Sequence, residues 1–192
     1  MSVPGTAASL RRLLEEEFRR VHPGDTTPFV VATSEQMSKS FSETVTLFPY
    51  RVEVDPTRRH VELPSLDETG NRRVALLLEM HFLVTVWPGN LTAAADKQLD
   101  VLEDCLAILD RNAVLAGDWL HPGYTWHEDA AVRVALEPMA VEDMMRVWDA
   151  LKTTYQLSVS YVVRTARVAE REVSGDHADV RSRRIDFGQR GR

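Results

Sequence analysis

Cysteine is nearly absent from this chain of 192 residues, which contains Cys105 alone. A single cysteine excludes an internal disulfide and a zinc site built from several cysteines. Cys105 falls within a helical pattern, where we expect a small buried apolar group. The Gly-rich phosphate loop, the His-Glu-x-x-His motif and the Gly-x-Ser-x-Gly motif are absent too. We therefore predict no enzyme activity, no catalytic residues, no cofactor and no metal.

Long hydrophobic runs and an excess of basic charge are also missing. No run approaches the length of a membrane span, and residues 1–5 lack the basic-then-apolar pattern of a secretory signal. The net charge of -6 argues against a general nucleic-acid binder, because phosphates favour a basic surface. We expect a cytoplasmic protein that binds other proteins, with no nucleic-acid or membrane partner.

The apolar residues that are present follow two periods. Spacings of three and four predict helices, and alternation predicts strands. This order predicts an α+β fold with helices on a mixed, mostly antiparallel sheet. We expect one domain over 1–167 and an arginine-rich tail or arm over 168–192. The predicted helices are 6–21, 92–112 and 141–151, the strands are 29–32, 44–54, 74–87, 131–137 and 155–164, and the loops include 33–42 and 117–129.

Four apolar stripes are the expected core. The strand over 74–87 is the longest and most apolar, so it should be central in the sheet. Pro49 cannot donate to a strand ladder, which places it at an edge, a bulge or a bend. The stripes are Leu10, Leu13, Leu14, Phe18 and Val21; Leu99, Leu102, Leu106 and Leu109; Val132, Val134 and Leu136; and Met144, Met145, Trp148 and Leu151.

Several short segments, in a fixed order, resemble one known protein family. The chain is similar to the tail-terminator or cap proteins of extracellular contractile injection systems, which are phage-tail-like particles of the antifeeding-prophage type. No single segment is diagnostic, but their order across residues 5–167 is. The segments are Leu47–Val54, Leu78–Thr85, Asn112–Leu115, Leu136–Pro138, Glu142–Asp143, Val147–Leu151 and Tyr155–Tyr161.

This resemblance implies a structural function. The family picture is a homohexameric ring that ends the inner tube and anchors the last layer of sheath, at the distal end of a particle that is released in some systems. Its partners would be copies of itself, the inner-tube protein and the sheath protein. A phage tail terminator or head-tail joining protein is the alternative. Ala113 and Ala140 depart from the family pattern, and Ala140 leaves the helix over 141–151 without a Ser or Thr cap.

Candidate interface residues lie in the loop over 117–129 and in the tail. Trp119, Tyr124 and Trp126 could anchor a protein contact or fold back onto the core. Arg181, Arg183 and Arg184 could form a solvated end or dock on an acidic neighbour as an added strand, with apolar support from Val180, Ile185 and Phe187. The polar row Gln156, Ser158, Ser160 and Arg164 could also face a neighbouring subunit.

A remote alternative is a small hydrolase. Its site would combine His81 and Glu79 with polar residues of the loop over 117–129, namely His121, His127, Glu128 and Asp129. Their spacing matches no known site, and a neutral, hydrogen-bonded His81 in a sheet is the simpler interpretation.

Overall fold

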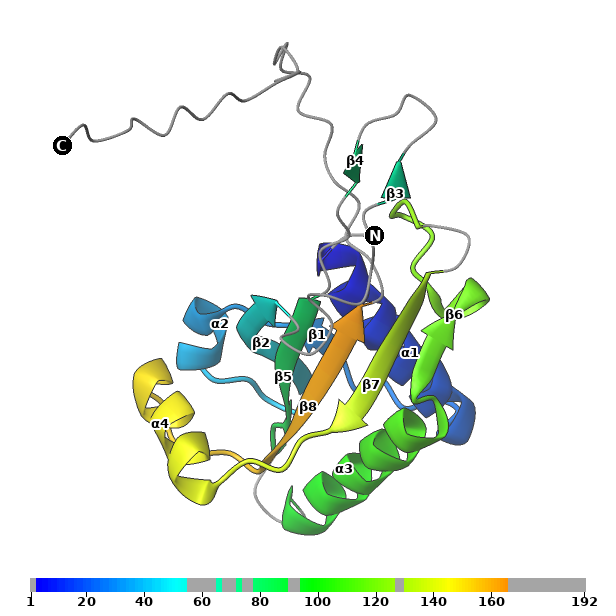
Figure 1. Cartoon of the computed structure of the whole chain (residues 1–192). Coiled ribbons are helices and arrows are strands. Elements are labelled where there is room, and N and C mark those ends of the chain that lie inside the picture. Colours follow the sequence, from blue (N-terminus) through cyan, green and yellow to red (C-terminus); the bar gives the residue numbers. More distant parts are fainter. Residues whose placement is uncertain are drawn as a thin grey trace, which may run out of the picture.

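A computed structural model describes residues 3–54, 65–66, 72–73, 78–89, 94–126 and 130–165. The sheet lies between two pairs of helices (Figure 1). We call the side that packs against α1 and α3 the first face, and the side that packs against α2 and α4 the second face. The helices are α1 (Val3–Val21), α2 (Ser34–Ser38), α3 (Ala94–Arg111) and α4 (Val141–Leu151), with a 3-10 turn, η1, at Gly117–Trp119.

The main sheet has six strands in the order β1-β2-β5-β8-β7-β6. Among these described strands β1 runs parallel to β2, and every other neighbouring pair is antiparallel. The predicted α+β class with a mixed, mostly antiparallel sheet is therefore confirmed. The strands are β1 (Phe29–Val31), β2 (Val45–Val54), β5 (Leu78–Val86), β6 (Val114–Ala116), β7 (Ala131–Leu136) and β8 (Ser158–Thr165), and β3 (Ser65–Leu66) pairs separately with β4 (Arg72–Arg73).

The larger core lies on the first face of the sheet. Leu10, Leu13, Leu14 and Phe18 of α1 pack there, as the helical stripe predicts. Strand β5 is third in the sheet and all of its residues are buried, so its central position is also confirmed. Cys105 of α3 is buried in this core, and burial raises the pKa of its thiol to about 12.

A smaller core lies on the second face, between the sheet and helices α2 and α4. Leu83 and Trp87 pack there against Met37 of α2 and Trp148 of α4. The rings of Trp87 and Trp148 meet edge to face, with centroids 5.9 Å apart. This arrangement explains why β5 is buried on both faces, since each face has its own helical layer.

The prediction of a loop over 33–42 is wrong in part, because α2 lies within it. Thr33 and Gln36 form a capping box, in which each side chain bonds the other residue's backbone N–H. The box satisfies N–H groups that a helix start leaves unpaired. Met37, fully buried under α4, fixes this single turn on the sheet.

Four residues expected in the core lie at the surface instead. Leu99 is 55% exposed, because the buried stripe of α3 runs through Val101, Cys105 and Ile108 on another side of the helix. Leu136 is 59% exposed at the end of β7, although its strand partner Tyr161 is buried. The other two, Val21 at the end of α1 and Met145 on the outer side of α4, are also exposed.

Pro49 occupies a β-bulge in the interior strand β2. The register between β2 and β5 shifts between Pro49 and Arg51, so Tyr50 is the extra residue. A bulge tolerates the missing N–H of proline. Of the three predicted positions for Pro49, the bulge is confirmed.

The start of α4 lacks a side-chain cap, as the sequence predicts. Ala140 is the N-cap residue in an extended conformation and makes no capping hydrogen bond. Replacement by serine should let its hydroxyl accept from the first turn, so we expect A140S to raise the free energy of unfolding by about 1 kcal/mol. Denaturant unfolding measures this change. An A140V control should give no gain, and an equal gain from both variants would contradict the capping explanation.

Within the described residues, none of the helices combines the length and apolar character that a membrane crossing needs.

Candidate functional site

The described part of the aromatic loop, residues 117–126, folds back onto α1. The backbone N–H of His121 donates to Ser9 Oγ at 2.8 Å, and the indole N–H of Trp126 donates to the carbonyl oxygen of His121 at 2.9 Å. Trp119 and Trp126 are half-buried against the larger core, and Tyr124 packs edge to face on His121. The three aromatic side chains are therefore held in place, and each keeps part of its surface exposed.

An open groove of about 660 Å³ lies beside this loop. Trp126, Leu120 and Pro122 form its apolar wall, while Arg12 of α1 and Asp118 of η1 supply opposite charges. Trp and Arg are enriched in protein–protein interfaces, and this groove contains Trp126 and Arg12. Arg181, Arg183 and Arg184 lie outside the described residues, so the structure does not place them.

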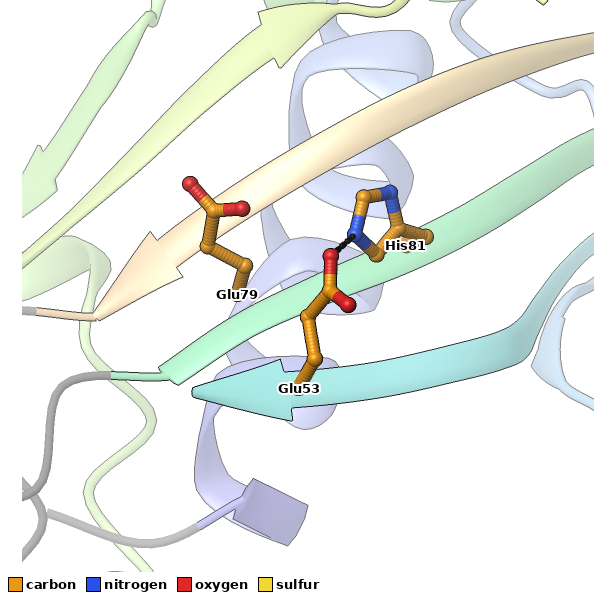
Figure 2. Close-up of side chains that lie close together, drawn as sticks. All are labelled: Glu53, Glu79 and His81. Carbon is orange, nitrogen blue, oxygen red and sulfur yellow. Dashed lines mark hydrogen bonds and ion pairs between the residues drawn. The ribbon is translucent and has the colours of Figure 1, made fainter. Parts of the chain in front are cut away.

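A network of polar side chains crosses the second face of the sheet, from β2 through β5 to β8. At its centre His81 is buried, and its two ring nitrogens face two carboxylates (Figure 2 shows Glu53). Nδ1 lies 2.8 Å from Glu137 Oε2, and Nε2 lies 3.2 Å from Glu53 Oε1. Both ring nitrogens of His81 thus have hydrogen-bond partners, so the hydrogen-bonded part of its prediction is confirmed.

Glu137, just after β7, accepts from several groups at one oxygen. Tyr50 Oη lies 3.1 Å and Ser160 Oγ 2.9 Å from Glu137 Oε2. Partial burial alone would raise the pKa of Glu137, but the hydrogen bonds from His81 and Ser160 outweigh it and lower that pKa. Burial raises the pKa of Tyr50 to about 12, so Tyr50 stays a neutral hydroxyl.

The prediction that the polar row of β8 faces a neighbouring subunit is wrong for two of its members. Ser158 and Ser160 are buried within the chain on the second face. Ser158 Oγ lies 2.8 Å from Thr85 Oγ1, and Ser160 belongs to the His81 network. Arg164 is the exposed member, and its Nε donates to Glu79.

Glu53, Glu79 and His81 could hold a metal ion by residue type, and their ligand atoms lie within 4.8 Å of one another (Figure 2). Each already has a protein partner, however. Glu79 is paired with Arg164, and both nitrogens of His81 face carboxylates. These contacts satisfy the charges without an ion, so the cluster fits a structural network better than a metal site.

The described residues of the hydrolase alternative do not lie together. His121 lies on the α1 side of the sheet, where its Nδ1 accepts from the backbone N–H of Gly123. His81 lies on the second face with Glu137 and Glu53. His127, Glu128 and Asp129 lie outside the described residues.

Tyr50, Glu53 and Glu137 belong to the polar network but were not among the candidates from the sequence. Alternation continued from Val45 and Leu47 puts Glu53 on the first face, and the bulge at Tyr50 moves it to the second, beside His81. Glu137 directly precedes Pro138, at a strand end where sequence patterns do not fix side-chain direction. The sequence signal for Glu137 is its position directly before a proline that ends the strand.

Two solved structures of terminator proteins are similar to this chain. One is the sheath/tube terminator of an extracellular contractile injection system, PVC, in its extended state, with a TM-score of 0.61 and 16% identity over 100% of this chain and 66% of that one. The other is the tube-terminating cap of the anti-feeding prophage, with a TM-score of 0.60 and 16% identity over 97% of this chain and 62% of that one. The chain thus spans slightly less than two thirds of their lengths.

These likenesses establish a shared fold. No curated protein sequence matches the chain. The sequence model of the Pvc16 N-terminal domain matches residues 5–181, which is most of the chain and agrees with the resemblance found in its short segments. The chain belongs to the Pvc16 N-terminal domain family.

Proposed function

We propose that this protein is a structural cap, or tail terminator, of a contractile injection system. It forms a ring, expected to be a homohexamer, that ends the inner tube and anchors the last layer of sheath. The observation that carries the proposal is the family match over residues 5–181, and the fold shared with two terminators supports it. The role is assembly rather than catalysis.

Length control explains why such a machine needs a cap. A tube and its sheath are stacks of rings joined by head-to-tail contacts, and contacts of that kind continue indefinitely. A ring with one polymerising face ends the stack. Because the sheath pulls on this ring during contraction, the contact between them must be large and stable.

We assign the contacts to two regions of the chain. The groove beside Trp126, with Trp119 and Tyr124 next to it, is the candidate surface for tube or sheath. The domain over 1–167 carries this groove, and the arm over 168–192 with Arg181, Arg183 and Arg184 adds a basic contact. The subunit is made in the cytoplasm and enters a particle that can be released, with no nucleic acid or membrane as partner.

Deleting the gene tests the terminator function. We expect particles with tubes of uncontrolled length and with sheath that detaches at one end, both visible by electron microscopy. Complementation with the full chain should restore normal particles. Tubes of normal length with firmly attached sheath in the deletion strain would refute the proposal.

The alternative, a phage tail terminator or head-tail joining protein, would also act as a ring. Genes for sheath, tube and an AAA+ ATPase beside this one, without a capsid gene, would favour the injection system. The mass of the purified protein, from light scattering or native mass spectrometry, tests the ring itself. A ring that closes only on a tube end would be missed without tube, so the measurement should include added tube.

A further inference from the structure

A second groove, which we call the acidic groove, lies between α3 and the end of β7. Its volume is about 430 Å³. The floor is apolar and comes from both elements, with Leu109 of α3, Val134 and Leu136 of β7, and Tyr161 of β8. Leu136 is 59% exposed here, which is a large apolar side chain open to solvent at a strand end. Such a surface fits an apolar partner.

Two carboxylates border this floor, and no basic side chain lines the groove. Glu103 and Asp110 are exposed, and neither forms an ion pair with another described residue. They are seven positions apart on α3, so they lie on one side of the helix, about 10 Å apart along its axis. The groove therefore suits a segment with two positive charges at that spacing and an apolar side chain nearby.

We propose that the acidic groove binds the C-terminal segment, residues 180–192, of a neighbouring copy of this chain. The segment contains five arginines and one aspartate, whereas the whole chain carries a net charge of -6. In an extended polyproline II conformation, residues three apart lie on one side at about 9 Å spacing. Arg181, Arg184 and Phe187 have this spacing, so two arginines meet Glu103 and Asp110 while the phenylalanine meets the floor beside Leu136.

The direction of β8 favours a neighbouring copy over the same chain. Tyr161 and Leu136, which line the groove, form one strand pair, and β8 then runs away from them to Thr165, beside Val132. Figure 1 shows the C-terminal end of β8 at the upper end of the sheet, whereas α3 lies at the bottom. Thr165, the last described residue, thus lies beside Val132 and not beside the Leu136 and Tyr161 pair that lines the groove. The 14 residues 166–179 can span up to about 50 Å when fully extended.

Disulfide trapping between full-length chains tests this contact. One chain carries Ala107→Cys, between Glu103 and Asp110, and the other carries Ser182→Cys, between Arg181 and Arg184. Cys105 stays in both, since it is buried and its raised pKa leaves little reactive thiolate. After mixing and mild oxidation we expect a covalent dimer of one A107C chain and one S182C chain, seen on a non-reducing gel and assigned by mass spectrometry.

Charge reversal supplies the specificity control. E103R with D110R in the groove chain should lower the cross-linking yield about tenfold, and R181E with R184E in the tail chain should restore it. The matched pair E35R and D149R, on the helices of the second face, should leave the yield unchanged. No dimer, a yield insensitive to these charges, or a disulfide confined to single chains that carry both cysteines would overturn the proposal.

This inference rests on the proposed self-association, but it fails separately from the terminator function. Loss of length control in the deletion strain together with no A107C–S182C dimer would leave the terminator function standing and refute the groove contact.

Discussion

Replacing Trp148 with alanine is expected to lower the free energy of unfolding by about 3–5 kcal/mol, the range for truncating a large buried aromatic side chain. Trp148 is 1% exposed and lies at the centre of the smaller core, against Trp87. It is the main link between α4 and the sheet, together with Met144 and Leu151. Denaturant unfolding followed by circular dichroism measures the loss.

Two variants separate packing from other effects. The indole N–H of Trp148 is buried without a hydrogen-bond acceptor among the described residues, so W148F forfeits no hydrogen bond and should cost about 1.5 kcal/mol or less. M145A changes an exposed side chain of the same helix and should cost about 0.5 kcal/mol or less. A W148A loss no larger than that of M145A would show that α4 is not fixed by this core.

Replacing Glu137 with glutamine should cost about 2–4 kcal/mol at neutral pH. The carboxylate accepts from His81, Tyr50 and Ser160, and an amide cannot accept at the same oxygen with the same strength. Removal of its charge also leaves the buried His81 with Glu53 as its remaining carboxylate partner. Thermal or denaturant unfolding measures the cost.

The pH dependence of this cost identifies its cause. Because the folded pKa of Glu137 is lowered from its ordinary value of 4.5, its contribution to stability is fully present above that value. It is lost as the pH falls through the lower folded pKa. The stability gap between wild type and E137Q should therefore shrink below about pH 4.5. E35Q, at an exposed glutamate of α2, serves as the control, and a gap for E137Q that stays constant from pH 7 to pH 3 would contradict the mechanism.

The sequence predicts the long periodic elements of this fold well and the short ones poorly. The bounds of α4 agree with the predicted helix, and the buried stripe of α1 agrees except at Val21. Helix α2 and strand β6 span five and three residues, too few for a period to emerge. A capping box at Thr33 and Gln36 marks α2 in the sequence, but it becomes a convincing helix start only once Met37 is known to be buried.

The side chains of the groove and of the polar network were also predicted only in part from the sequence. Leu136 continues the apolar alternation of Val132 and Val134. Strand β7, however, extends beyond the part of the sheet that α3 covers, so its last apolar side chain lies in the floor of a groove. Buried serines on β8 were expected at a surface, because alternation identifies the polar side of a strand without telling what covers it. Glu53 changes faces through a bulge, which depends on tertiary pairing.

The two outer strands of the main sheet, β1 and β6, are three residues long. The function that we propose requires subunits that stay separate until they meet a tube end, and long open strand edges would favour pairing between free subunits. Outer strands of three residues leave few unpaired backbone N–H and C=O groups for another molecule to pair with. The short outer strands therefore agree with the proposed cap, because they limit pairing between free subunits through their sheet edges.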